Sequence, residues 1–457
     1  MSITARRPSS QTPLQLAEPS ALPVTLAAGL TCRLASGAIV EHANLDHGAS
    51  TPALVAVKQA VDSAARTYAS VHRGKGQASQ ISTRFYEAAR EEVARFVGTR
   101  QGDIVVFTRH TTDSMNLLAS VLPTGTKVFV FESEHHATLL PWVAADTVRL
   151  PIPRTVEEAE GTLEQALSSH PADHRLVAIT GASNVTGELW PLHRLTPIAR
   201  RHGARVVIDA AQLAPHRRID LRTLGADWVA FSGHKVYAPY GTGVLAGRRD
   251  WLDAGAPYLA GGGASKAATP HGVEWQCGPA RHEGGSPNVL GAVALAAACS
   301  VLRRNLDQIE AHEARLFSEL QRGLSEIPGV RTLSIFGPDH ARVPVVAFTL
   351  DGYDPDLVAT ILSTEHGIGV RDGRFCAHLL VDDLLARADG GAAGGRDGAG
   401  TAVRASLGLG NRPEHVERLV SAVRDLAVRG PRRRYHRDVS GEWRTPGVPA
   451  VQVPLPW

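Results

Sequence analysis

Apolar positions along the chain follow two spacings that predict alternating helices and strands. Residues 53–66 and 84–97 carry apolar side chains at helical spacing, and Ser82 and Thr83 precede the second segment as candidate N-caps. Short apolar runs bounded by turn residues predict strands at 105–108, 127–131, 175–180, 205–209, 227–232 and 243–246. Strands that alternate with helices are typical of an α/β fold with a mostly parallel sheet.

The pattern changes after Pro287 and predicts a second, smaller domain. An alanine-rich helix is expected to run to about residue 306, followed by strands at 343–350 and 369–371 and a last helix at 413–427. We therefore expect an N-terminal extension at 1–40, a large domain at 41–300 and a small α+β domain at 301–430. The Ala/Gly/Asp/Arg-rich segment 386–401 predicts a flexible loop, and the Pro/Arg-rich tail 431–457 predicts irregular structure.

Composition excludes several classes of protein and adds little else. The 457 residues are 43% hydrophobic, enough for a sizeable core, and 48 basic residues nearly balance 45 acidic ones, so nothing points to nucleic acid. The four cysteines are too sparse for a disulfide framework and lack metal-ligand spacing, so we expect a reducing cytoplasm and no metal. No apolar run approaches the ~20 residues of a membrane span, and the apolar segment 22–30 lacks the features of an export signal.

Two charged side chains stand where predicted strands end. Asp209 closes the run 205–209, and Lys235 follows the strand 227–232 in the sequence SGHK, before a turn rich in glycine and proline. Ligands of open α/β sheets bind at the carboxyl ends of the strands. A lysine that forms a Schiff base and a buried aspartate that keeps a pyridine nitrogen protonated are the two requirements of pyridoxal 5'-phosphate. The pair therefore predicts this cofactor.

A series of short sequences in fixed order resembles one family over most of the chain. The series is LDHGAST from Leu45, VHRG from Val71, FTRHTTDSMN from Phe107, ESEHHATLLPW from Glu132, SNVTG from Ser183, DAAQ from Asp209, SGHK from Ser232, EGGSPN from Glu283, VRDGRFCA from Val370 and VRAS from Val403. In this order it resembles the class V branch of fold-type I pyridoxal-phosphate enzymes, closest to the cysteine desulfurase group. The resemblance implies a large domain with a mostly parallel sheet of seven-stranded type and a smaller C-terminal domain.

The resemblance also assigns side chains to the cofactor. Thr111 and Thr112 open a predicted helix whose N–H groups and hydroxyls suit a phosphate. Carried over from the family, the further cofactor ligands are Ser232, His234, Asn184, Gln212, Asp209 and Lys235, with Ser286 reaching the phosphate from a second subunit. His135 would stack on the pyridine ring and relay protons. A homodimer with a shared active site is therefore implied.

The chemistry that separates members of the family rests on two other side chains. Cys376 stands where a cysteine desulfurase places the thiol that removes sulfur as a persulfide, and Arg371 and Arg374 nearby favour a thiolate. Arg404 would bind the substrate carboxylate together with Asn184, and Arg371 is a second candidate. Histidines usually precede the cysteine, but here Arg374 and Phe375 do.

Three functions are compatible with these residues. The first is an L-cysteine desulfurase that passes sulfur from Cys376 to an acceptor protein or a small molecule. The second keeps the cofactor but is a C–S lyase, an epimerase or an aminotransferase, in which Cys376 takes no part. The third is a cofactor-binding regulatory or scaffold protein without turnover, against which the set of catalytic side chains argues. Two departures from the family, His110 for glycine and Asp113 for glutamate, are expected to affect the pocket near the cofactor.

Overall fold

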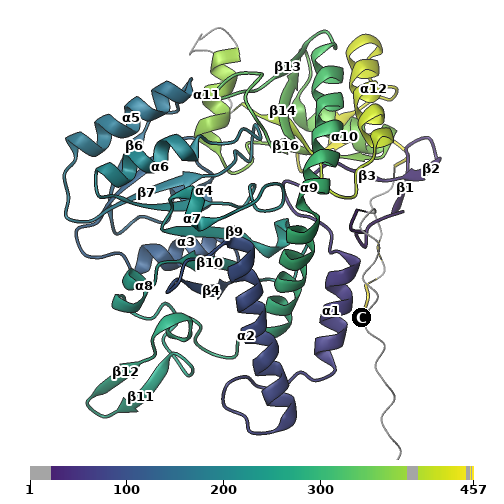
Figure 1. The fold of residues 1–457 in the computed structure, drawn as a ribbon. Coiled ribbons are helices and arrows are strands. Elements are labelled where there is room, and N and C mark those ends of the chain that lie inside the picture. Colours follow the sequence, from purple (N-terminus) through teal and green to yellow (C-terminus); the bar gives the residue numbers. More distant parts are fainter. Residues whose placement is uncertain (1–21, 389–399, 449–452, 454) are drawn as a thin grey trace, which may run out of the picture.

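A seven-stranded sheet forms the centre of the computed structural model, which describes residues 22–388, 400–448, 453 and 455–457 (Figure 1). Its strand order is β4-β10-β9-β8-β7-β5-β6. The strands are β4 (Ile104–Thr108), β5 (Lys127–Phe131), β6 (Asp146–Leu150), β7 (Arg175–Thr180), β8 (Arg205–Asp209), β9 (Trp228–Ser232) and β10 (Gly243–Gly247). Only β10 runs antiparallel to its neighbours in this sheet, so the expected α/β fold with a mostly parallel sheet is confirmed.

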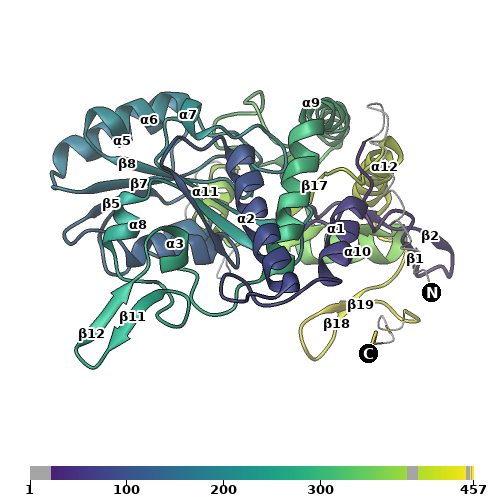
Figure 2. The ribbon, with the colours of Figure 1, turned by 60° about the horizontal axis from the view of Figure 1, so that its bottom comes forward.

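Helices cover both faces of the sheet, because successive strand residues bury their side chains on opposite faces. In β9, for example, Val229 and Phe231 join one hydrophobic cluster while Trp228 and Ala230 join another. The first cluster packs beneath α1 (Val55–Ala65), α2 (Gln77–Val97), α5 (Val156–Ser169), α6 (Leu192–Arg201) and α9 (Val289–Ser325). The second packs beneath α3 (Thr111–Ser120), α4 (His136–Leu139) and α8 (Asp250–Ala254), on the other side of the sheet (Figure 2).

The C-terminal part of the chain forms a second layer with its own core. Its antiparallel sheet has the order β13-β14-β17-β16, formed by β13 (Val330–Thr332), β14 (Val345–Leu350), β17 (Ala402–Ser406) and β16 (Arg371–Gly373). The helices of this part are α10 (Pro355–His366), α11 (His378–Ala388) and α12 (Pro413–Arg429). An early segment joins this unit, since β3 (Ala43–Asn44) pairs in parallel with β15 (Ile368–Gly369). The second layer therefore contains residues from before the large sheet as well as from after it.

Short elements complete the structure. A hairpin of β11 (Ser265–Thr269) and β12 (Gly272–Trp275) projects from the body near α8 (Figure 1), and α7 (Leu221–Leu224) is a single turn. The hairpin of β1 (Thr31–Arg33) and β2 (Ile39–Glu41) lies beside the second layer. A further hairpin, β18 (His436–Arg437) with β19 (Trp443–Arg444), lies in the tail, so the prediction of a wholly irregular tail was wrong.

Helix α9 is a core element of both layers. Within the described ranges it is the one helix long and apolar enough to meet a length-and-hydropathy test for a membrane span, a property that the sequence pattern did not reveal. More than half of its apolar window is buried inside the protein. Its residues up to Ile309 belong to the core of the large sheet, and those from Leu316 belong to the second core. The division into domains at residue 300 stays a prediction.

Several element boundaries differ from the sequence prediction for identifiable reasons. Helix α2 begins at Gln77 after Gly76, and Ser82 lies inside it, where its hydroxyl donates to the carbonyl of Thr67 instead of capping. Strand β17 was missed because it buries Arg404 among apolar neighbours. Residues 386–388 of the predicted loop form the last turn of α11, and residues 389–399 lie outside the described part.

Candidate active site

A cavity of about 450 Å³ opens where the strands of the large sheet end. Thr180, Asp209 and Ser232, the last residues of β7, β8 and β9, all line it. The second layer contributes the opposite wall through Arg371, Phe375, Cys376 and Arg404. The cavity thus lies at the carboxyl edge of the sheet, as expected for a ligand site in an α/β protein.

Lys235 ends the single 3-10 turn Gly233–Lys235 that follows β9 and lines the cavity. Gly233 is required in this turn because a Cβ atom there would lie 2.4 Å from the carbonyl oxygen of Thr242. Burial lowers the pKa of the Lys235 amine to about 8, although the nearby Asp209 carboxylate favours the charged form. The amine is therefore much more easily deprotonated than an exposed lysine.

Asp209 lies at the floor of the same cavity and is almost fully buried. Its Oδ2 accepts a hydrogen bond from Thr138 Oγ1 (2.7 Å), and its Oδ1 accepts one from the Ala211 N–H (2.9 Å). Burial raises the pKa of this carboxyl, while the two hydrogen bonds and Lys235 act in the opposite direction. A carboxylate held in this way is suited to pair with one buried cation.

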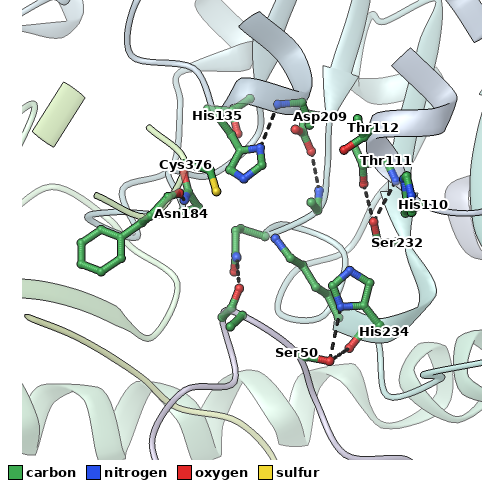
Figure 3. A pocket seen from close by; sticks show the side chains of 18 of the residues that line it. Ser50, His110, Thr111, Thr112, His135, Asn184, Asp209, Ser232, His234 and Cys376 are labelled. Carbon is green, nitrogen blue, oxygen red and sulfur yellow. Dashed lines mark hydrogen bonds between the residues drawn. The ribbon is translucent and has the colours of Figure 1, made fainter. Parts of the chain in front are cut away.

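Several hydrogen-bond donors lie close together at the N-terminus of α3. The Thr111 N–H and hydroxyl both contact Ser232 Oγ at 2.8 Å, and Thr112 and His234 also line the cavity (Figure 3). Burial, followed by the effect of Lys235, lowers the pKa of His234 to about 4, so the ring is neutral at physiological pH. Together these groups offer neutral donors and a helix N-terminus to an anion.

The two departures noted in the sequence have different structural effects. His110 lines the cavity and caps α3, because its Nδ1 accepts a hydrogen bond from the Asp113 N–H (3.1 Å). The Asp113 carboxylate instead bonds to Arg109 and to the hydroxyl of Tyr258. Only the histidine therefore changes the lining of the cavity.

His135 is the N-cap residue of α4, in the segment that follows β5, and it lies next to Cys376 in the cavity (Figure 3). Its Nδ1 accepts a hydrogen bond from the Ala137 N–H (3.0 Å), so the proton of the neutral ring is on Nε2. Burial, and after it Lys235, His136 and Arg404, lowers the pKa of His135 to about 3. The ring therefore stays neutral and offers one N–H.

Two amide side chains are fixed by contacts to backbone carbonyls. Gln212 Nε2 donates to the Gly48 carbonyl (2.6 Å), and Asn184 Nδ2 donates to the Phe375 carbonyl (2.8 Å). Both residues are buried and line the cavity. Asn184 thereby joins the large sheet to the segment that carries Cys376.

Cys376 stands on a tight turn between β16 and α11 and is exposed at the cavity. Phe375 and Cys376 both have positive φ values (51° and 54°), which side chains other than glycine rarely adopt. The turn is held because the His136 N–H donates to the Cys376 carbonyl (2.8 Å), in addition to the bond from Asn184. Strained backbone held by its surroundings is frequent at functional sites.

Arg404 is buried behind the cavity in β17, and its position is fixed by two acceptors. Its Nη1 donates to the Asn184 carbonyl and its Nη2 to Asp46 Oδ1, both at 3.0 Å, while the guanidinium lies 5.1 Å from the centre of the Phe375 ring. Arg371 lies opposite Arg404 in the β16–β17 ladder and is half-exposed, with its Nη1 at 3.9 Å from Asp46 Oδ2. Sequence reasoning missed Asp46 and Thr138, although LDHGAST contains the first and ESEHHATLLPW the second.

All but one of the predicted site residues line this cavity. Ser286 lines two neighbouring cavities instead, beside Glu283 and Pro287, so its expected role from a second subunit stays a prediction. Among the described residues no group of three or more His, Cys, Asp or Glu side chains has the geometry to hold a metal ion.

The cavity fits pyridoxal 5'-phosphate group by group. The aldehyde requires an amine, the protonated pyridine nitrogen requires a buried carboxylate, and the phosphate requires several donors. Lys235, Asp209 and the cluster of Thr111, Ser232 and His234 supply these three requirements around one cavity.

Comparisons with known proteins agree with this fit. Residues 43–419 match the family model of class-V aminotransferases. The chain is 35% identical over 368 residues to a probable cysteine desulfurase of Vibrio cholerae, covering 78% of this chain and 86% of that protein. It is 36% identical over 401 residues to one of Aeropyrum pernix, covering 84% and 93%. The solved cysteine desulfurase of Thermococcus onnurineus superposes with a TM-score of 0.75 at 32% identity, over 85% of this chain and 95% of that structure. The protein therefore belongs to the class-V aminotransferase family of pyridoxal-phosphate-dependent enzymes.

Proposed function

We propose that this protein is an L-cysteine desulfurase, which converts L-cysteine to L-alanine and leaves the sulfur as a persulfide on Cys376. The observation that carries the proposal is the place of Cys376, an exposed thiol in the cavity that also holds Lys235 and Asp209. The names of the similar proteins, cysteine desulfurases from bacteria and archaea, support the same reaction.

The cofactor, when bound, withdraws electrons from the substrate Cα and so makes its proton removable. Asp209 would hold the charged ring nitrogen, and Thr111, Thr112, Ser232 and His234 would hold the phosphate. Asn184 and Gln212 line the remaining part of the cavity, next to Lys235. His135, neutral and with its proton on Nε2, would lie against the ring.

Proton transfer falls to Lys235, and His135 contributes a hydrogen-bond donor. A lysine with a pKa of about 8 is partly neutral near physiological pH, so its amine is able to take the proton from the substrate Cα and later return one. His135 has a pKa of about 3 and therefore acts as a hydrogen-bond donor rather than as a base at neutral pH. Because Nδ1 accepts from the Ala137 N–H, the donor is Nε2, on the other side of the ring.

With the cofactor bound, the sulfur transfer balances between Cys376 and the substrate and needs no further reactant. Arg404, with Asn184 beside it, binds the substrate carboxylate and orients the side chain. The thiolate of Cys376 attacks the substrate sulfur, so that an S–S bond forms as the substrate Cβ–S bond breaks. The electron pair of that bond remains with the carbon skeleton, which becomes alanine on protonation at Cβ. No external oxidant or reductant is required.

The partners follow from the reaction. We place the enzyme in the cytoplasm as a homodimer in which Ser286 of each chain completes the phosphate site of the other. A sulfur-acceptor protein or a small thiol would remove the persulfide from Cys376, which is exposed. The large domain at 41–300 would carry the cofactor, and the small domain at 301–430 would carry Cys376 and Arg404.

The test is the identity of the products formed from L-cysteine. A desulfurase gives alanine and, with a thiol reductant, sulfide in equal amounts. Pyruvate with ammonia would identify a C–S lyase, and a keto acid without alanine would identify an aminotransferase. Either of the latter results would refute the proposal, as would the absence of any turnover, which would indicate a binding protein.

A further inference from the structure

The loop from Glu283 to Ser286 lies outside the candidate active site of its own chain. Both residues line the two neighbouring cavities of about 370 and 940 Å³. Ser286 is exposed, whereas the Glu283 side chain is about 7% exposed. The loop needs two glycines, because a Cβ atom on Gly284 would lie 2.3 Å from the Leu259 carbonyl oxygen and Gly285 has a φ of 88°. The chain thus passes from a buried carboxylate to an exposed hydroxyl within one short turn.

Four hydrogen bonds hold the Glu283 carboxylate against the body of its own chain. Its Oε1 accepts from Arg90 Nη1 and from the Phe107 N–H, both at 2.7 Å. Its Oε2 accepts from Arg90 Nη2 and from the Tyr86 hydroxyl, both at 2.9 Å. An ionised carboxylate accepts hydrogen bonds and donates none, so all four contacts favour the charged form of Glu283.

Two further anchors of the loop are neutral. Asn288 Nδ2 donates to the Tyr240 carbonyl (2.7 Å), and the Gly285 N–H donates to the Gly262 carbonyl (2.7 Å). A hydrogen bond with a charged partner is about twice as strong as one between neutral groups. Glu283 is therefore the strongest of the three anchors.

The bond from Phe107 also joins the loop to the phosphate-binding segment of the same chain, because Phe107 lies in β4 shortly before Thr111. That segment has supports of its own. Ser232 Oγ accepts from the Thr111 N–H, and the His110 ring caps α3. Loss of the Glu283 charge should therefore disturb the loop more than the N-terminus of α3.

We propose that Glu283 is a positioning residue that holds Ser286 in place for the phosphate site of a second copy of the chain. The inference rests on the proposed function, in which Ser286 of each chain completes the phosphate site of the other. It adds that Glu283 acts across the dimer, since its charge in one chain sets how tightly the other chain holds the cofactor. A hydroxyl that is already held in place loses less conformational freedom when it binds a ligand.

Mixed dimers with one competent active site distinguish the two chains. One chain keeps Lys235 and the other carries Lys235→Ala, so the yellow colour of the lysine-linked cofactor reports on the first chain alone. The chains carry different affinity tags, are co-expressed and are purified on both tags in turn. The dissociation constant of pyridoxal 5'-phosphate is then read from the visible absorbance, which needs no turnover.

The position of Glu283→Gln in the mixed dimer decides the result. In the Lys235→Ala chain it should raise the dissociation constant about tenfold, because one amide oxygen cannot accept from all four donors. In the chain that keeps Lys235 the rise should stay below about threefold, because the loop of the other chain is then unchanged. Tyr86→Phe in the Lys235→Ala chain removes one of the four bonds and should give a smaller rise. If Glu283→Gln prevents folding, this milder variant decides, and the absence of any rise would refute the inference.

Glu188→Gln is the matched control, because Glu188 is another buried glutamate that ties down backbone N–H groups. Its carboxylate accepts from the Ile335 and Phe336 N–H groups at 2.6 and 2.8 Å and from the Ser334 hydroxyl at 2.8 Å. In the Lys235→Ala chain this variant should leave the dissociation constant unchanged, since it holds no part of the loop. Thermal unfolding and size-exclusion chromatography verify that each mixed dimer is folded and intact.

Ser286→Ala in the Lys235→Ala chain separates this inference from the proposed function. If Ser286→Ala weakens cofactor binding by the other chain but Glu283→Gln does not, the inference is refuted while the shared phosphate site stands. An effect of Glu283→Gln that is as large in the chain that keeps Lys235 would refute it as well, because Glu283 would then act within its own chain. If Ser286→Ala has no effect, or if no dimer forms, the shared phosphate site and the inference both fail.

Discussion

The perturbed amine of Lys235 gives a prediction that needs no cofactor. In the cofactor-free protein, burial lowers the pKa of this amine from 10.5 to about 8. Below pH 8 the protonated amine therefore destabilises the folded state by about 3 kcal/mol relative to a neutral side chain. Because part of the side chain contacts solvent, we reduce this destabilisation to about 2 kcal/mol. Lys235→Met, which fills similar space without a charge, should raise the free energy of unfolding at pH 7 by that amount.

The sign of the pH dependence follows from proton linkage. Between about pH 8 and 10.5 the unfolded chain still holds the proton that the folded amine has lost, so this group makes the folded wild type more stable as pH rises. The Lys235→Met variant lacks that contribution. The difference in stability between the two proteins should therefore be largest below pH 8 and disappear above about pH 10.5.

Urea denaturation of the two cofactor-free proteins from pH 7 to 10.5 measures this difference. Lys58→Met is the control, because Lys58 lies exposed on α1 beside Asp62, far less buried than Lys235. Equal stability of wild type and Lys235→Met at pH 7, or a difference that does not change with pH, would refute the lowered pKa of Lys235.

Two further predictions concern the neighbours of Lys235. Asp209→Ala removes the acceptor of Thr138 and Ala211 together with the charge that holds a pyridine nitrogen protonated, so turnover should fall by about 100-fold or more; unchanged turnover would mean that the ring does not lie at Asp209. His135 stays neutral above pH 5 because its pKa is about 3. His135→Gln should therefore lower kcat without changing the shape of its pH profile between pH 5 and 8, and a shifted profile would contradict the neutral ring.

The strands that position the site could be predicted because they are short apolar runs between turns. β7, β8 and β9 were expected within a residue of their ends, and this alone placed Asp209 and the segment of Lys235 at the same edge. The amphipathic edge strand β6 was missed, since its residues are half-exposed and only Leu150 is buried. Apolar periodicity finds buried elements more easily than exposed ones.

Long-range polar contacts were the part that the sequence did not reveal. The bond between Asp46 and Arg404 joins residues 358 positions apart, and the bond between Asn184 and the Phe375 carbonyl joins residues 191 apart. The sequence indicated Arg404 and Asn184 by motif but not their partners, because these pairings depend on how the two layers pack. The hydrogen bonds from His136 and Asn184 that hold the turn of Cys376 in place are also long-range contacts of this kind.

The central claim is that Cys376 takes the sulfur from L-cysteine, and Cys376→Ser tests it most directly. The variant should keep the yellow colour and the borohydride-reducible link between cofactor and Lys235, because Cys376 lies on the opposite wall of the cavity. It should bind L-cysteine with a change in absorbance but form almost no alanine and no protein persulfide, whereas the wild type forms both. Alanine production by Cys376→Ser at the rate of the wild type would contradict the account and leave the thiol without a role in the reaction.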